Sequence, residues 1–230
     1  MNRSQFFKAF SYSIPVLLGY LAIGIAFGLM LVDAGYPWWL ALVMSVLMYA
    51  GAGQYLAIGL FAAGVTLYEA ALVQIVVNAR HIAYGLSLFK RLNRCGKFKY
   101  YIIFALTDET FALLSSVPEE QCNENHGAFM FYVALLDQFY WVAGSVIGAI
   151  LGSILPFSME GISFALTALF ITLTLEQLFR IKKPGIFIVS AAVAVLSVII
   201  FPAKTALLTG LILSLAVVAL LNRSAPGKLW

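Results

Sequence analysis

Charged residues are scarce in this chain: only 10% of its 230 residues are Asp, Glu, Lys or Arg, against about 25% in ordinary soluble domains. Hydrophobic residues make up 63% of the sequence, and the mean hydropathy is +0.97. No hydrophilic stretch is long enough to form a soluble domain. This composition excludes a soluble globular protein and predicts an all-α polytopic membrane protein, with residues 1–230 as one transmembrane domain. The net charge of +4 reflects the loops rather than affinity for nucleic acid.

Cysteine and histidine are equally rare, with two of each in the chain. Cys95 and Cys122 lie in different loops, and their spacing matches no metal or redox motif. Two histidines give poor support to a Ser-His pair or a di-histidine metal site, and no Gly-x-Ser-x-Gly or His-Glu-x-x-His motif is present. We therefore expect neither an enzyme nor a bound metal or other cofactor.

Long apolar runs dominate what remains. A helix that crosses a bilayer needs about 17–25 predominantly apolar residues. Eight runs approach or meet this length, with Gly or Pro at most of the gaps between them. They are residues 12–32, 38–62, 67–89, 98–117, 128–152, 161–179, 185–201 and 205–221.

The cationic loops limit how these runs cross the membrane. The N-terminus, residues 90–99, residues 180–183 and the C-terminal tail are all basic, which predicts that they are cytoplasmic. Three runs separate the N-terminus from residues 90–99, and three more separate that loop from residues 180–183. These regions lie on the same side of the membrane if one run in each group of three enters and leaves on the same face. The second run is the candidate, and the sixth is its counterpart. This arrangement has six crossings, with the acidic loop after the fourth run outside. The alternative is eight full crossings.

A short pattern occurs twice. Tyr20-x3-Gly24-x3-Gly28 recurs as Tyr140-x3-Gly144-x3-Gly148. With six crossings the two segments run in opposite directions and would form an inverted repeat, as in many secondary transporters. With eight crossings the repeat is parallel. Close packing of small-xxx-small helix faces explains the glycines without any repeat.

The third run contains a polar stretch near its middle. Asn78 and Arg80 are expected close to the bilayer midplane, where a charge costs at least about 2.5–3.5 kcal/mol and normally has a partner inside a helix bundle. Gln74, Asn78 and His81 share one helix face, whereas Arg80 points toward a neighbouring helix. His81 titrates near neutrality when unperturbed. It is either a proton relay or a hydrogen-bonded packing residue.

Three acids in later runs can meet Arg80. Asp108 and Glu109 are adjacent in the fourth run, so they face different neighbours, and Asp137 precedes Gln138 in the fifth. One acid can pair with Arg80, either as a permanent lock between helices or as a switchable clamp for a carboxylate. The excess of acids is typical of proton coupling, and it also suits a substrate ammonium. Asp137 is either a second functional acid or a structural partner of Gln138.

Gly51-Ala52-Gly53-Gln54 interrupts the second run. If this stretch is unwound, it must line a cavity or be buried in protein, and in transporters such breaks bind substrate carboxylates at half-helix N-termini. The alternative is a contact between helices through small residues. We therefore take Gly51, Gly53 and Gln54 as candidate site residues beside the charged cluster.

Five motifs bear on the family. They are Gly51-Ala52-Gly53-Gln54, Asn78-x-Arg80-His81 followed by Tyr84-Gly85, Thr107-Asp108-Glu109-x-Phe111, Trp141-Val142-x-Gly144-x-x-x-Gly148, and Gly161-Ile162-Ser163-Phe164-Ala165-Leu166-x-Ala168-x-Phe170. Through these motifs the chain resembles the AzlC family, the large subunit of bacterial branched-chain amino acid exporters. One departure is Ser163, where the family usually has Asp, so ion coupling here would differ or rely on Asp137.

The resemblance implies export of valine, leucine, isoleucine or similar amino acids by proton-driven exchange. It also implies a small AzlD-type membrane subunit as partner, and a place in the bacterial cytoplasmic (inner) membrane. Our preferred hypothesis is a secondary transporter. The competing hypothesis is a non-transporting assembly or sensor subunit in which the buried charges form a structural lock, and a channel is a third option.

Overall fold

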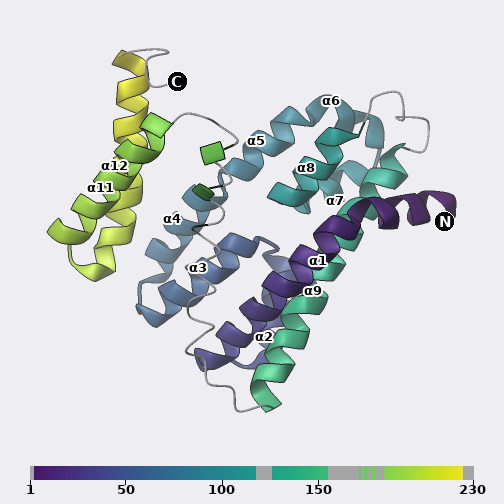
Figure 1. Cartoon of the computed structure of the whole chain (residues 1–230), viewed down its shortest axis with the longest axis horizontal. Helices are drawn as coiled ribbons and strands as arrows, with labels where there is room; N and C mark the ends of the chain where they lie inside the picture. The colour runs from purple at the N-terminus through teal and green to yellow at the C-terminus, as the bar shows by residue number, and fades with distance from the viewer. Residues whose placement is uncertain are drawn as a thin grey trace. The chain divides into compact units, whose positions relative to one another are not determined.

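The computed structural model describes residues 3–117, 126–154, 171, 174–175, 178–179 and 184–224, and the secondary structure in this part of the chain is helical, as expected (Figure 1). Two compact units are distinguished, Met1–Ala62 with Gln74–Ser163 and Ala63–Val73 with Phe164–Trp230. Each is described by itself. The expectation of one transmembrane domain stays a prediction, and Ser163 lies outside the described residues.

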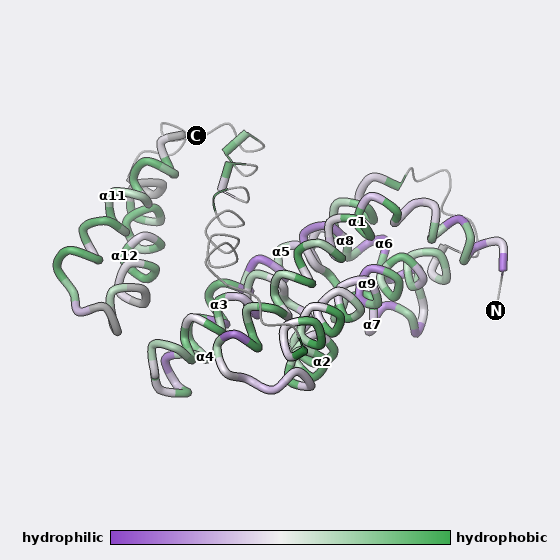
Figure 2. Tube along the Cα trace, turned by 60° about the horizontal axis from the view of Figure 1, so that its bottom comes forward, coloured by the Kyte–Doolittle hydropathy of each residue, from purple (hydrophilic) through white to green (hydrophobic). Residues whose placement is uncertain are grey.

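In the part of the chain that the structure describes, two helices are long and apolar enough to cross a membrane, α1 (Arg3–Asp33) and α9 (His126–Ile154). A third candidate combines α4 (Leu67–Asn78) and α5 (Arg80–Ser87), which are followed after a bend of 62° by α6 (Phe89–Leu92) and η1 (Asn93–Cys95). Hydrophobic positions cover most of α1, α2 and α9, and hydrophilic ones gather near α6 and α7 (Figure 2). The count of six crossings stays a prediction.

Helices α1 and α9 pack side by side and run parallel (Figure 1). Gly24 lies against the backbone of Gly144, and Gly28 against that of Gly148 and Ala149. A Cβ on Gly28 would lie 2.1 Å from the Ser145 carbonyl oxygen, so only glycine permits this approach. The close-packing explanation of the glycines is therefore confirmed. The opposite orientation of these two segments, expected for six crossings with the second and sixth runs folded back, is wrong.

The second apolar run is broken, as predicted, but at a different residue. Helix α2 (Trp38–Leu47) ends at a turn through Met48–Ala50, and α3 begins at Gly51 and extends to Ala62. Tyr49 has a positive φ of 38° in this turn. Gly51–Gln54 thus form the first turn of a helix rather than an unwound stretch. The Phe61 ring lies 5.4 Å from that of Tyr36, so α3 returns to the end of α1 from which α2 starts.

The fourth apolar run also folds back, which the sequence did not predict. Helix α7 (Phe98–Phe104) and helix α8 (Asp108–Ser116) are separated by Ala105–Thr107. Arg91 precedes this hairpin, and its guanidinium donates hydrogen bonds of 2.9 Å to the carbonyls of Leu114 and Val117 at the end of α8. Both ends of the α7–α8 hairpin therefore lie beside the cationic loop. One continuous helix does not form over this run, and the number of crossings stays a prediction.

The second unit contains α11 (Pro184–Ile200) and α12 (Ala203–Ser224), which pack against each other. A Cβ on Gly210 would lie 3.2 Å from the Cβ of Ser197, and the Ser214 hydroxyl donates to the carbonyl of Ser190 at 3.5 Å. Residue numbers rise along one helix as they fall along the other, so the pair is antiparallel. Most of the sixth apolar run lies outside the described residues.

Candidate functional site at two helix breaks

Helices α2 and α3 form one hairpin and α7 and α8 form another, and both hairpins contact α9 at Gln138 near their breaks. The Gln138 side-chain amide donates to the carbonyl of Val46 near the end of α2 at 3.2 Å, and its oxygen accepts a 2.5 Å hydrogen bond from the Tyr101 hydroxyl on α7. Gln138 is thus a bridge between the hairpins. The sequence offered Asp137 as a structural partner for Gln138, but the hydrogen bonds of these two side chains go to other residues.

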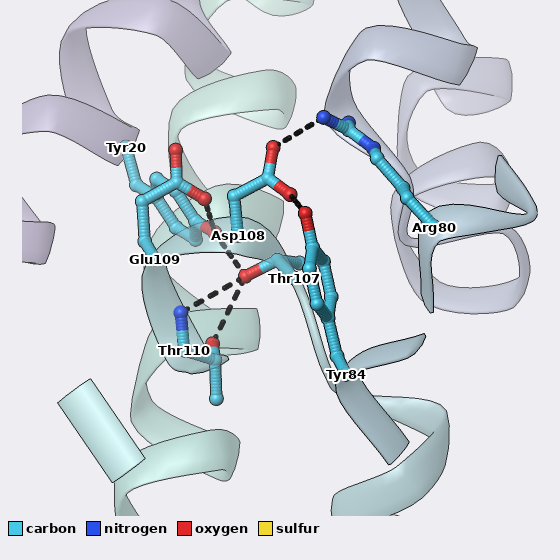
Figure 3. A network of polar contacts seen from close by, with 7 residues as sticks. All are labelled: Tyr20, Arg80, Tyr84, Thr107, Asp108, Glu109 and Thr110. Atoms are coloured by element: carbon cyan, nitrogen blue, oxygen red, sulfur yellow. Dashed lines mark hydrogen bonds and ion pairs between the residues drawn. The ribbon is translucent and has the colours of Figure 1, made fainter. Parts of the chain in front are cut away.

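Arg80 forms an ion pair with Asp108, with 2.5 Å between Nη1 and Oδ2 (Figure 3). Asp108 is the first residue of α8, and its other oxygen accepts a hydrogen bond from the Tyr84 hydroxyl of α5. The Arg80 and Asp108 side chains are 33% and 21% exposed. The prediction that Arg80 meets one of the two adjacent acids is therefore confirmed, and tertiary structure selects Asp108.

Glu109 points in a different direction, as its position next to Asp108 predicts (Figure 3). Its Oε2 accepts a 2.7 Å hydrogen bond from the hydroxyl of Tyr20 on α1. The same hydroxyl lies 2.6 Å from the Oγ1 of Thr107, the residue that caps the N-terminus of α8 through the amide of Thr110. Two acids in the first turn of α8 also complement the positive end of its helix dipole.

Asp137 is fully buried in α9. Its Oδ2 accepts a 2.8 Å hydrogen bond from the Thr110 hydroxyl, and its Oδ1 is buried without a hydrogen-bond partner. The ion pair present among the described residues joins Arg80 and Asp108, so Glu109 and Asp137 are held by hydroxyl groups instead. Glu109 is half-buried and Asp137 fully buried, and burying an ionised carboxylate without a cation is costly.

Gln74 and Asn78 share a face of α4, as predicted, and contact each other at 3.0 Å. Gln74 also donates to the carbonyl of Gly53 at 2.8 Å. A Cβ on Gly53 would lie 2.7 Å from the Gln74 oxygen, so this glycine lets α3 approach α4 closely. His81 follows the break at Ala79 and lies beside the Tyr84 ring, 5.8 Å between ring centroids.

The start of α3 is packed against α9. Gln54 is fully buried, where it donates to the Ser45 hydroxyl at 3.1 Å and accepts from the indole nitrogen of Trp141 at 2.8 Å. A Cβ on Gly51 would lie 3.0 Å from the Trp141 ring. These contacts fix the N-terminal turn of α3 next to the ring of Tyr20, which is 5.4 Å from that of Trp141.

The hydroxyl side chains of the site were not predicted from the sequence. Thr110 and Tyr101 were not among the candidate residues, while Tyr20, Tyr84 and Thr107 were noted only as members of motifs. One signal was present for Thr110. It lies three residues after the cap residue Thr107, so its hydroxyl had to be in the same first turn of α8 as Asp108 and Glu109.

Half-buried charges at breaks in apolar helices, with the buried Asp137 beside them, mark this chain as a multi-pass membrane protein with a polar site inside its bundle, an arrangement typical of transporters. The AzlC protein family model matches residues 15–155. The chain belongs to the AzlC family.

Individual relatives agree with this assignment. The branched-chain amino acid transport protein AzlC of Bacillus subtilis is 35% identical over 96% of this chain and 89% of its own length. An uncharacterized membrane protein of Helicobacter pylori is 38% identical over 95% of both chains. The inner membrane protein YgaZ of Escherichia coli is 31% identical over 92% of this chain and 88% of its own length. No solved structure matches the chain. The family supports a transport role, and the protein is a multi-pass protein of the bacterial inner membrane.

Proposed function

We propose that this protein is a secondary transporter that exports branched-chain or other small apolar amino acids in exchange for protons. The observation that carries the proposal is the pair of acids Glu109 and Asp137, which hydroxyls hold at the level of the two helix breaks while Arg80 is occupied by Asp108. Acids at membrane depth that lack a fixed cation are typical of proton relays. The substrate class rests on family membership.

The two breaks suit the two ends of an amino acid. The first turn of α3 contains no acidic residue, so its backbone amides and dipole favour the substrate carboxylate. The first turn of α8 contains Asp108 and Glu109, which favour the ammonium group. Arg80 is a second anchor for the carboxylate when its pair with Asp108 opens. His81 lies beside Tyr84 at the edge of this site, where it would relay protons.

The fold also suggests how six crossings arise. Helix α1, the α4–α5 segment and α9 would cross the membrane, and the hairpins α2–α3 and α7–α8 would enter it from opposite faces. If the sixth apolar run, α11 and α12 each cross as well, both termini and all the basic loops are cytoplasmic, in accord with the positive-inside rule. In this arrangement the acidic loop after α8 is cytoplasmic too, whereas the sequence alone favoured the outside.

The decisive experiment measures export directly. A strain that lacks the gene is loaded with a panel of amino acids, and their intracellular accumulation is followed with and without the protein. Glu109→Gln and Asp108→Asn should each abolish pH-dependent export of valine at normal expression. Asp33→Asn, at the exposed end of α1, is the matched control and should export normally. Unchanged valine efflux in both site variants would contradict the mechanism.

The partner is a separate part of the proposal. Family resemblance suggests a small AzlD-type membrane subunit, and export by this chain is expected to require it. The same accumulation assay answers the question when the two genes are expressed separately and together. Full export by this chain alone would remove the partner from the proposal.

A second candidate function is a non-transporting subunit in which the charges lock two helices together. The observation in its favour is that both Asp108 oxygens are engaged, one by Arg80 and one by Tyr84. A lock needs only opposite charges, so the exchanged variant Arg80→Asp/Asp108→Arg should then regain full function. A transporter that uses Arg80 on its substrate should remain inactive after this exchange.

A further inference from the structure

A continuous series of hydroxyl groups connects Glu109 and Asp137, which form no ion pair with any described residue; Figure 3 shows the part from Glu109 to Thr110. It consists of four oxygen–oxygen contacts: Glu109 Oε2 to Tyr20 at 2.7 Å, Tyr20 to Thr107 at 2.6 Å, Thr107 to Thr110 at 3.0 Å, and Thr110 to Asp137 Oδ2 at 2.8 Å. We call these five side chains the hydroxyl chain. It joins α1, α8 and α9.

The hydrogens of the hydroxyl chain can be counted. Four contacts at hydrogen-bond distance require four hydrogens, because two oxygens this close repel each other when no hydrogen lies between them. Tyr20, Thr107 and Thr110 each supply one hydroxyl hydrogen. If both carboxylates are ionised, only three hydrogens serve the four contacts. One additional proton, on either acid, completes the series.

We propose that Glu109 and Asp137 share a single proton, which passes between them through the hydroxyls of Tyr20, Thr107 and Thr110. When Glu109 holds the proton, it donates to Tyr20, each hydroxyl donates to the next, and Thr110 donates to the ionised Asp137. Transfer breaks the O–H bond on Glu109, shifts one hydrogen along each contact and forms an O–H bond on Asp137. Every hydroxyl then donates in the opposite direction, and no atom or electron is gained or lost.

Burial shields the hydroxyls and the Asp137 end of the hydroxyl chain from water, whereas Glu109 at the other end is half-buried. Tyr20 and Thr107 are 4% and 7% exposed, and Thr110 and Asp137 are fully buried. The Asp137 Oδ1 is buried without a hydrogen-bond partner, which costs less for a neutral carboxyl than for a carboxylate. The hydroxyls are therefore the route between the two acids that the described contacts provide.

Other ionisable groups face the two acids from the surrounding elements. They are Tyr49 from the turn between α2 and α3, Arg80 from α5, Asp108 from α8 and Tyr140 from α9. Tyrosines are neutral near neutral pH, and Arg80 and Asp108 neutralise each other. None of these groups supplies a fixed cation to either end of the hydroxyl chain.

The proposal deepens the proposed function, because it rests on proton-coupled transport and names the route within it. Its test is spectroscopic and does not depend on transport. The purified full chain in lipid vesicles is measured by infrared spectroscopy, in which a protonated carboxyl has its own C=O stretching band. Carbon-13 aspartate separates the Asp band from the Glu band, and Asp137→Asn and Glu109→Gln assign each band. The wild-type protein should show one protonated carboxyl per chain, divided between the two residues.

Two variants cut the hydroxyl chain at opposite ends. Thr110→Val leaves two contacts, Glu109 to Tyr20 and Tyr20 to Thr107, and the hydroxyl hydrogens of Tyr20 and Thr107 are enough for both. The proton should therefore stay on Asp137, and the Glu109 band should disappear. Tyr20→Phe leaves Thr107 and Thr110 donating toward Asp137, so the proton should stay on Glu109 and the Asp137 band should disappear. In both variants the total should remain one.

If each hydroxyl acted only on its own neighbour, the number of protonated carboxyls per chain would not stay at one in these variants. If each hydroxyl only stabilised its own neighbour, Thr110→Val would raise the Asp137 band and leave the Glu109 band unchanged, and that result would overturn the proposal. So would a wild-type total of zero or two. The wild-type spectrum therefore tests the shared proton even if a variant fails to fold, and Thr110→Ser, which keeps the hydroxyl, should restore the wild-type division.

Two buried hydroxyls outside the hydroxyl chain provide controls. Tyr55 donates to the carbonyl of Ile23 at 2.6 Å, and Ser13 contacts the Tyr140 hydroxyl at 3.0 Å. Tyr55→Phe and Ser13→Ala should leave both bands unchanged. Valine efflux from the same vesicles, now reconstituted with the small AzlD-type subunit as well, separates the two hypotheses. A shared proton without efflux removes the proposed function, and efflux with independent acids removes only the shared proton.

Discussion

The two hairpins of the first unit have the same backbone plan and opposite chemistry. Both α2–α3 and α7–α8 break partway along an apolar run and begin a second helix there (Figure 1). The second helix α8 starts with a threonine cap and two acids, whereas α3 starts with Gly51-Ala52-Gly53 and no acid. The α8 end is held by Arg80, Tyr84 and Tyr20, and the α3 end by close contact with Trp141.

This difference shows two ways to stabilise a helix start at membrane depth. Charged side chains complement the amides and dipole of α8. Arg80 of α5 neutralises Asp108, and Tyr20 of α1 donates a hydrogen bond to Glu109. Small side chains let neighbouring helices pack closely against the start of α3. In the proposed mechanism the first arrangement serves proton transfer and the second receives the substrate carboxylate. Four experiments test this contrast.

The largest effect concerns the faces from which the hairpins enter. In a chain with Cys95→Ser and Cys122→Ser, single cysteines replace Ala34 and Ala62 at the open end of α2–α3, or Lys97 and Ser115 at the open end of α7–α8. A membrane-impermeant thiol reagent on intact cells should label the first pair and spare the second, because the proposed topology opens the two hairpins to opposite faces of the membrane. All four should react after cell disruption. Labelling of Ser115→Cys in intact cells would show that α8 crosses the membrane.

The charged hairpin should depend strongly on its ion pair. Arg80→Gln leaves Asp108 without a cation, and loss of one partner of a buried pair costs about 3–5 kcal/mol. Because these side chains are 33% and 21% exposed, we expect a loss of about 2 kcal/mol, measured as a fall in thermal stability in detergent. The double variant Arg80→Gln/Asp108→Asn should lose less than either single variant. Strictly additive losses would show that the pair is not coupled.

The bridge between the hairpins should matter less than the ion pair. Gln138→Leu removes the donor to Val46 and the acceptor for Tyr101. Hydrogen bonds between membrane helices contribute about 0.6–2 kcal/mol each, so we expect a loss of about 1–2 kcal/mol in the same thermal assay. Phe139→Leu, at the next position and 65% exposed, is the control. Equal stability of the two variants would mean that the bridge is not stabilising.

The smallest effect tests the uncharged hairpin through two glycines of α3. A Cβ on Gly51 would lie 3.0 Å from the Trp141 ring, whereas a Cβ on Gly59 meets nothing within 4 Å. Gly51→Ala should therefore destabilise the protein by about 1 kcal/mol through overpacking. Gly59→Ala should stabilise it by about 0.5–1 kcal/mol, since alanine favours a helix over glycine. The two changes should shift the melting temperature in opposite directions, and shifts of the same sign would remove the packing argument.

Parts of the site could be read from the sequence with good accuracy. Arg80 required a partner because an unpaired charge in lipid is costly, and the adjacent acids had to face different neighbours because successive helix residues point in different directions. The break in the second run was visible in its glycines, although its position was displaced toward Tyr49. The α7–α8 break was not visible, since Ala105-Leu106-Thr107 contains neither Gly nor Pro.

The sequence by itself determined that this chain resides in a membrane and buries charge there, because hydropathy over about 20 residues and the cost of an unpaired charge depend on local composition. Tertiary structure decided which acid meets Arg80, which way each hairpin returns, and which hydroxyls join Glu109 to Asp137. Those contacts link α1, α8 and α9, which are distant in sequence. A neutral hydroxyl can form a hydrogen bond with many kinds of group, so only the packing of the helices decides which group it meets.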